Sequence, residues 1–208
     1  MNRRLVIRLL GTILLVEAIC MVPSLLLALI YRDGDASALA KTIGVICIIA
    51  LPMRLLARPE QKNLRAREGF LVVVLAWILM SIFGGLPFRL HGMISNMADA
   101  FFEAVSGFTT TGATILRSFD HLPRGLMFWR SFTHWIGGMG VLVLTLALLP
   151  QMTGRTSHLI RAESPGPSLS KIMPKMGDSA KILYAIYLVL TIIEFVILII
   201  AGMTPYDA

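Results

Sequence analysis

Long apolar stretches alternate with short polar connections along this chain of 208 residues. A helix that crosses a bilayer needs about 20 mainly apolar residues. Five stretches meet that length: residues 8–31, 38–56, 69–90, 125–150 and 180–202. A sixth, 96–108, is too short to cross, and apolar segments of roughly 10–14 residues are typical of re-entrant or interfacial helices. The pattern predicts an all-α integral membrane protein.

Composition supports this class. Hydrophobic residues make up 56% of the chain and charged residues 15%, whereas soluble domains carry about 25% charged residues. The first stretch, 8–31, is too long for the apolar core of a signal peptide, so we expect it to be retained as a span. Cys20 and Cys47 lie in separate apolar stretches, which favours packing over a metal or redox pair.

The net charge of +7 comes from cationic residues in particular connections. An aromatic–basic cluster for nucleic acid is not evident, because Trp129 and Arg130 lie in an apolar run. Most of the cations lie in the N-terminus and in the second and fourth connections: Arg3, Arg4, Arg8, Arg54, Arg58, Lys62, Arg65, Arg67, Arg155, Arg161, Lys171, Lys175 and Lys181. If every span crosses once, these residues share one side, and the positive-inside rule places the N-terminus in the cytoplasm. The connection between the third and fourth spans then enters from outside.

That connection contains the most distinctive stretch of the chain, Ser-Gly-Phe-Thr-Thr-Thr-Gly-Ala-Thr at 106–114. Backbone that leaves the helix at membrane depth is tolerated only where protein or water surrounds it. The short helix before it, 97–108, has a candidate cap in Ser95 or Asn96 and carries Asp99 in its first turn, which suits a helix N-terminus. Its C-terminus, the negative end of the dipole, points toward the segment and favours a cation there. The order predicts the helix–pore-helix–helix unit of a tetrameric cation channel.

Three motifs in this order resemble a known family. Residues 106–113 resemble the first selectivity-filter segment of the Trk/Ktr/HKT potassium transporter superfamily. Phe-Trp-Arg-Ser-Phe-Thr-His-Trp-Ile-Gly-Gly-Met-Gly at 128–140 is similar to the start of that family's second pore-lining helix, and Leu-Ile-Arg-Ala-Glu-Ser-Pro-Gly-Pro at 159–167 to a cytoplasmic loop of its bacterial TrkH branch. Two helices before the first pore unit also resemble that branch.

The resemblance implies four pore units in one polypeptide with pseudo-fourfold symmetry, of which this chain holds the first part. It divides the chain into an N-terminal two-helix hairpin (1–67), a first pore unit (68–150), a basic cytoplasmic loop (151–178) and the first helix of a second, truncated pore unit (179–208). Within the pore unit we expect spans at 69–90 and 125–150, the pore helix at 97–108 and the filter at 109–114. The Asp-Ala pair at 99–100 recurs at 207–208, as if a second pore helix began there.

The filter hypothesis assigns ion binding to backbone carbonyls. The predicted ligands are Thr109, Thr110, Thr111, Gly112 and Ala113, with K+ held at Thr110 and Thr111. A carbonyl row of this kind replaces the water around a cation. Gly112 is the sharpest prediction, because glycine adopts unusual backbone angles at little cost. Glu103, Ser106 and Arg130 are predicted to support the filter.

Further residues have alternative interpretations. Glu17 and Glu194 lie in the middle of spans, where a carboxylate is either functional or structurally bonded; for Glu17 the structural role is favoured. Arg130 and His134 share a helix face and would pair with Glu103 or Asp99 or line the outer mouth. The glycines of 137–140 favour close helix packing over a hinge.

The function predicted from the sequence is potassium uptake across the bacterial inner membrane by a Trk-type subunit or a fragment of one. K+ is the transported ion, no cofactor is expected, and no motif indicates an enzyme. The resemblance implies a homodimer and a cytosolic TrkA-like nucleotide-binding regulator. Two alternatives stay open: a non-conducting interaction subunit anchored in the membrane, and a proton-coupled carrier (a symporter) that uses Glu17 or Glu194.

Overall fold

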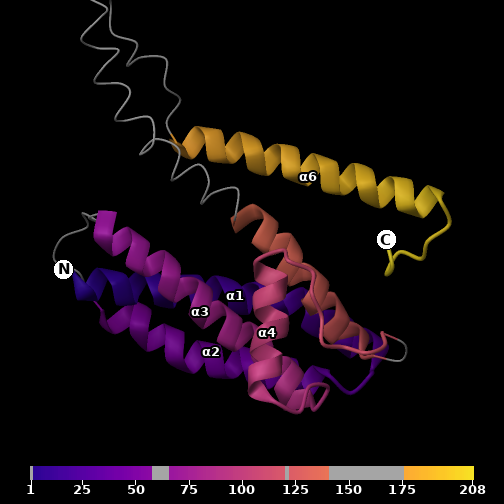
Figure 1. The fold of residues 1–208 in the computed structure, drawn as a ribbon, viewed down its shortest axis with the longest axis horizontal. Helices are drawn as coiled ribbons and strands as arrows, with labels where there is room; N and C mark the ends of the chain where they lie inside the picture. The colour runs from indigo at the N-terminus through magenta and orange to yellow at the C-terminus, as the bar shows by residue number, and fades with distance from the viewer. Residues whose placement is uncertain (1, 58–65, 120–121, 141–175) are drawn as a thin grey trace, which may run out of the picture. The chain divides into compact units, whose positions relative to one another are not determined.

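The computed structural model describes residues 2–57, 66–119, 122–140 and 176–208 (Figure 1). These residues form helices and connections, with no strand in any of the four ranges. The helices are α1 (Arg3–Tyr31), α2 (Ala36–Leu56), α3 (Ala66–His91), α4 (Met97–Phe108) and α6 (Met176–Ile200), and residues 124–140 are also helical. The predicted all-α class is therefore confirmed.

Two compact units divide the chain, Met1–Gly137 and Gly138–Ala208. In the first, α1, α2 and α3 run side by side, and α4 lies across their direction (Figure 1). The predicted division at 67/68 falls inside this unit, because the hairpin of α1 and α2 packs against α3. The hairpin and the pore unit share one hydrophobic core, which includes Met21, Ile46, Phe88 and Trp129.

Glycines allow the helices of the first unit to approach closely. A Cβ on Gly11 of α1 would lie 2.9 Å from the carbonyl oxygen of Ala50 in α2. A Cβ on Gly85 of α3 would lie 2.5 Å from the carbonyl oxygen of Ala100 in α4. Any side chain at either position would push the backbones apart, since real Cβ atoms do not approach so closely.

Apolar side chains also cover the outside of the helices. Ile19 and Ile30 on α1, Ile48 on α2 and Val74 on α3 are all exposed. Among the described residues, four helices are long and apolar enough to cross a membrane: Arg3–Tyr31, Ala36–Leu56, Arg67–His91 and Lys181–Ile200. An apolar outer surface on such helices is expected where lipid replaces water, and we describe the chain as a multi-pass membrane protein.

The second unit contains α6 and the turn after it. Thr204 begins a helical turn: the Ala208 amide donates to the Thr204 carbonyl (3.0 Å), and the Thr204 hydroxyl donates to Asp207 Oδ2 (2.6 Å). Asn96 and Ala100 make the same amide-to-carbonyl bond, 3.0 Å, at the start of α4. The alanine of each Asp-Ala pair thus donates its amide to the carbonyl four residues earlier. The loop predicted at 151–178, the motif at 159–167 and residues 141–150 of the predicted fourth span lie outside the described residues, apart from the start of α6.

Candidate functional site

The short helix α4 begins with the cap that the sequence suggested. Asn96, rather than Ser95, is the N-cap, and its side chain accepts a hydrogen bond from the Ala98 amide at 3.1 Å. Asp99 is exposed in the first turn, beside the amides that no helical carbonyl can satisfy. The helix covers Met97–Phe108, as predicted, and its C-terminal turn is buried.

That last turn is packed directly against the helix over 124–140. A Cβ on Gly107 would collide with the Thr133 hydroxyl, and one on Gly137 would collide with the carbonyl oxygen of Phe108. Phe108 meets Trp129 edge to face, with ring centroids 6.3 Å apart. These contacts position the C-terminal end of α4, and they confirm the predicted packing role for Gly137.

The segment after α4 folds its amides back onto the end of that helix. The amides of Thr109 and Thr110 donate to the carbonyls of Val105 (2.8 Å) and Gly107 (2.9 Å). The amides of Thr111 and Gly112 both donate to the Ser106 carbonyl, at 3.0 and 3.5 Å. These four amides are therefore used within the protein, so that the carbonyls are what this part of the backbone offers to a ligand.

The carbonyls differ in how many protein donors they have. Thr109 O accepts from the Thr110 hydroxyl (2.7 Å), and Ala113 O accepts from the Ser106 hydroxyl (2.6 Å). The carbonyls of Thr110, Thr111 and Gly112 accept no hydrogen bond from any residue in the described ranges. The two predicted K+ positions are thus among the three carbonyls that have no donor.

The backbone of this segment is unusual at alternate residues. Gly112 has φ +75°, as expected for a position that favours glycine, and Thr110 has φ +57°. A positive φ is rare for a β-branched residue such as threonine. Residues held in such angles concentrate at functional sites. Because successive peptide groups are turned by these angles, their carbonyls do not follow the simple alternation of a regular strand.

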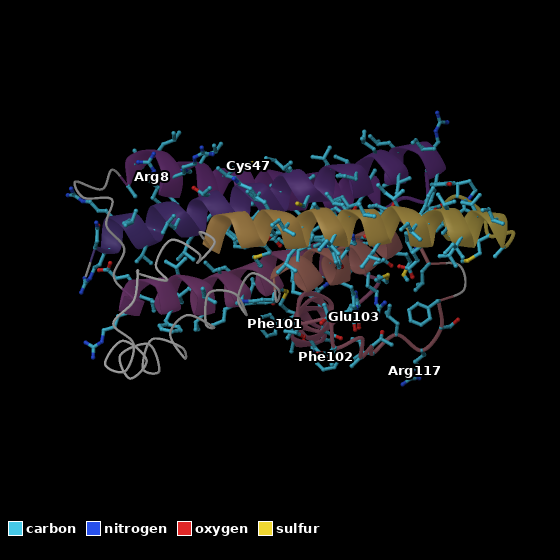
Figure 2. The ribbon with its side chains drawn as sticks, turned by 90° about the horizontal axis from the view of Figure 1, so that it is seen from above. Arg8, Cys47, Phe101, Phe102, Glu103 and Arg117 are labelled. Carbon is cyan, nitrogen blue, oxygen red and sulfur yellow. The ribbon has the colours of Figure 1, made fainter. Side chains whose placement is uncertain are left out.

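Glu103 joins the far end of the segment to the neighbouring helix. Its carboxylate accepts from the Thr114 hydroxyl (2.9 and 3.1 Å), from the Ile115 amide (3.1 Å) and from Arg130 Nε (2.5 Å). Glu103 is 1% exposed. Figure 2 shows Glu103 on α4 together with the exposed Phe102. The C-terminal end of the segment is thus held by two neighbouring contacts, Ser106 at Ala113 and Glu103 at Thr114.

The structure separates the alternatives for Arg130 and His134. Arg130 pairs with Glu103, and not with Asp99. His134 Nδ1 lies 2.9 Å from the carbonyl oxygen of Arg130. Of the three predicted support residues, Glu103 and Arg130 are therefore paired and Ser106 bonds to Ala113, whereas His134 bonds within its own helix.

Other candidates lie away from this segment. Cys20 and Cys47 are free and pack against the core, as expected. Glu17 of α1 is buried, and its carboxylate oxygens accept no hydrogen bond from the described residues. Glu194 is on α6, in the second unit, with an exposed side chain.

Some contacts had no clear signal in the sequence. Thr114 and Ile115 lie beyond the expected ligands, yet they supply the bonds to Glu103. The indole of Trp129 donates to the carbonyl of Gly84 (2.8 Å), 45 residues away. A glycine pair in an apolar helix signals close packing, but not with which partner.

A short helix with a buried C-terminal turn, a carbonyl-bearing segment and a flanking membrane helix define the class: a membrane protein with a pore-loop unit of the kind found in cation channels. The sequence model of the TrkH family, described as cation transport proteins, matches residues 38–206. The chain therefore belongs to the TrkH family of cation transport proteins, which are transporters and not enzymes, and the resemblance drawn from its motifs is confirmed.

Individual relatives agree with the family. The chain is 40% identical over 210 residues to the Trk system potassium uptake protein TrkH of Vibrio parahaemolyticus, covering 100% of this chain and 43% of that protein. It is 32% identical to the Trk system potassium uptake protein TrkG of Escherichia coli, covering 99% and 43%. The crystal structure of the potassium transporter TrkH from Vibrio parahaemolyticus superposes with a TM-score of 0.82 at 36% identity, covering 100% of this chain and 41% of that one. The chain thus spans less than half the length of these relatives.

Proposed function

We propose that this chain forms the first part of a Trk-type potassium uptake protein, and that residues 109–113 form one quarter of its selectivity filter. The observation that carries the proposal is the set of three carbonyls, at Thr110, Thr111 and Gly112, that accept no bond from the described protein. Carbonyl oxygens of this kind can replace the hydration shell of K+. Thr109 and Ala113 contribute with the lone pair that their hydroxyl donors leave over.

The electrostatic potential at residues 109–113 favours a cation. The C-terminus of α4 ends at Phe108, directly before the segment, and the negative end of a helix dipole attracts positive charge. The nearby carboxylate of Glu103 is paired with Arg130 and is bonded to Thr114. Glu103 therefore acts as a positioning group, and the ion is left to the backbone carbonyls.

One quarter of a filter cannot surround an ion, so the proposal requires the remaining units. The relatives are potassium uptake proteins more than twice as long as this chain. Three further pore units would complete the ring, and K+ would pass inward down its electrochemical gradient. The homodimer and the TrkA-like regulator belong to this proposal, because they rest on the family resemblance.

The orientation is proposed from the charges. In the first unit, exposed arginines gather where α1 and α3 begin and α2 ends: Arg3, Arg4, Arg8, Arg54 and Arg67. The positive-inside rule places this end, and the N-terminus, in the cytoplasm of a bacterial cell. The filter segment follows the other end of α3 and so faces outside the inner membrane. Figure 2 shows Arg117 projecting from the connection after this segment.

The direct test replaces Gly112 by serine in the full-length transporter and measures ion uptake in a bacterial strain that lacks other potassium uptake systems. A side chain at φ +75° is strained by roughly 1–2 kcal/mol, and relief of that strain turns the carbonyls. We expect the preference for K+ over Na+ to fall by about ten-fold, the equivalent of about 1.4 kcal/mol.

Gly92 supplies a matched control. It has φ +87° and open space around its Cβ position, as Gly112 does, but it follows α3 and lies outside the filter segment. Gly92→Ser should carry the same strain and leave ion preference unchanged. Equal selectivity of Gly112→Ser and the parent would refute the filter assignment. A parent protein that carries no rubidium or potassium would instead favour a non-conducting membrane subunit.

A further inference from the structure

The turn between α1 and α2 makes an unusual contact with the second half of the pore unit. The turn is formed by Arg32 at φ +58° and Gly34 at φ +90°. Asp35 occupies the N-cap position of α2 and is fully buried. Aspartate at this place normally accepts a bond from an amide of its own helix. Here it makes no such bond, and its backbone has α-helical rather than extended angles.

Both aspartates of the turn bond instead to a helix 91 residues away. Asp35 Oδ2 accepts from the amide of Leu126 at 2.9 Å, and Asp33 Oδ2 accepts from the amide of Arg124 at 3.1 Å. The guanidinium of Arg124 lies over the ring of Tyr31, 4.4 Å from its centroid. Three contacts therefore join the hairpin turn to the start of the helix over 124–140.

Among the described residues, the N-cap position of that helix offers no side-chain acceptor to its first amides. The Met127 amide donates to the carbonyl of Pro123 at 3.0 Å, which places Pro123 at the N-cap position. A proline side chain has no oxygen to accept a bond from the first free amides. The carboxylates of Asp33 and Asp35 fill this role, and their negative charge suits the positive end of the helix dipole.

The approach is close enough to require a glycine. A Cβ on Gly125 would lie 2.6 Å from both Asp35 Oδ2 and the Cβ of Ala28. The first turn of this helix therefore fits against the hairpin only without a side chain at that position. The same helix carries Arg130, Thr133 and Gly137, against which Glu103 and the end of α4 are packed.

From this geometry we infer that the N-terminal hairpin is a positioning device for the pore, in which Asp35, assisted by Asp33, caps the helix over 124–140 and thereby fixes the filter segment. The inference rests on the proposed function, because it assigns the hairpin a role in ion selection. This role would explain how α1 and α2, which lie outside the pore unit, contribute to ion selection. Asp35 acts through the helix and Arg130, so it is a positioning residue and does not touch the ion.

The first experiment does not depend on transport. Amide hydrogen exchange of the peptide around 124–127 is measured in the full-length transporter for Asp35→Ala, Asp35→Asn and the parent. Loss of the carboxylate should speed exchange at this peptide by about five-fold. Asparagine retains an acceptor oxygen and should restore most of the protection. Peptides from α3 and from the first turns of α4 should exchange as in the parent, which shows that the variant is folded.

The second experiment compares ion preference at equal amounts of membrane protein. Asp35→Ala should reduce the preference for K+ over Na+ by about three-fold, Asp33→Ala should have a smaller effect because that bond is exposed, and Asp35→Asn should resemble the parent. Ser37→Ala, an exposed serine on the same turn of α2, is the matched control and should change neither measurement.

The outcomes separate the two proposals. Unchanged exchange at 124–127 in Asp35→Ala would overturn the cap. Faster exchange with unchanged ion preference would overturn the link from the hairpin to the filter. Failure of the parent to transport K+ would count against the proposed function, while the exchange result would still decide whether Asp35 caps the helix.

Discussion

Glu103 of α4 and Glu17 of α1 are both buried glutamates, 1% and 2% exposed, but their surroundings differ completely. The Glu103 carboxylate accepts bonds from Thr114, Ile115 and Arg130. The two oxygens of Glu17 accept none from the described residues, although a Cβ on Gly84 would lie 3.2 Å from Oε1. A buried carboxylate is costly unless it is bonded. Glu103 thus holds neighbouring backbone in place, whereas Glu17 makes no hydrogen bond with the described residues.

The largest effect is expected for Glu103→Ala. Removing the buried carboxylate leaves Arg130, whose side chain is only 13% exposed, without its ionic partner, which costs up to about 3–5 kcal/mol. It also releases Thr114 and Ile115, which directly follow the proposed filter residues 109–113. We expect little folded protein and no selective K+ uptake, measured by size-exclusion chromatography in detergent and by uptake in whole cells.

A double variant separates the effect of Glu103 on folding from its effect on ion preference. Glu103→Leu combined with Arg130→Met removes both charges and keeps apolar volume, which often restores stability. The amount of folded protein should recover, whereas K+ preference should not, because the bonds to Thr114 and Ile115 are still missing. If folded protein and K+ preference both recovered, the only role of Glu103 would be to pair with Arg130.

Gly137→Ala should have the next largest effect. Its methyl group would collide with the Phe108 carbonyl at the end of α4, and overpacking of this kind typically costs about 1–3 kcal/mol. We expect a lower unfolding temperature and a weaker preference for K+. Gly44→Ala is the control, because Gly44 of α2 has open space around its Cβ position. A neutral result at both positions would show that the end of α4 tolerates displacement.

Much of this arrangement was predictable because local chemistry determines it. The range of α4 followed from an apolar run with a cap before it and a glycine–threonine segment after it, and the structure gives Met97–Phe108. The positive φ of Gly112 followed from the need for an unusual backbone angle. The pairing of Arg130 with Glu103 was one of two options that the sequence left open, the other being Asp99, and the structure shows the first.

Contacts between distant segments were not predictable in the same way. Asp35 is next to α2 in sequence, so local rules assign it to the cap of α2, yet it bonds to Leu126. The donor to the Gly84 carbonyl is Trp129, which nothing in the sequence pairs with that glycine. Such partners depend on how helices cross, and the pattern of a single chain specifies helix faces but not crossings.

Ser106→Ala should have a smaller effect than Glu103→Ala or Gly137→Ala. It removes one bond, from the Ser106 hydroxyl to the Ala113 carbonyl (2.6 Å), and a typical hydrogen bond contributes about 1 kcal/mol. K+ uptake should weaken by about three-fold to five-fold, with a modest loss of preference over Na+. Ser81→Ala is a close control, because Ser81 is also buried but donates to Trp77 within its own helix. Equal effects of both variants would mean that the bond to Ala113 has no special role.

The smallest effect is expected for Glu17→Gln. Glutamine has the same shape and no charge, and it breaks no bond that Glu17 makes with the described residues. Uptake of K+ should stay within about two-fold of the parent, and stability should be equal or higher, because an ionised carboxylate is more costly to bury than an amide. The double variant with Glu194→Gln tests the proton-coupled carrier directly. If uptake persists without either carboxylate, coupling through these groups is excluded. If Glu17→Gln alone abolishes uptake in well-folded protein, Glu17 has a transport role and its lack of a partner reflects a site for a mobile proton or water, so the contrast with Glu103 would have to be drawn differently.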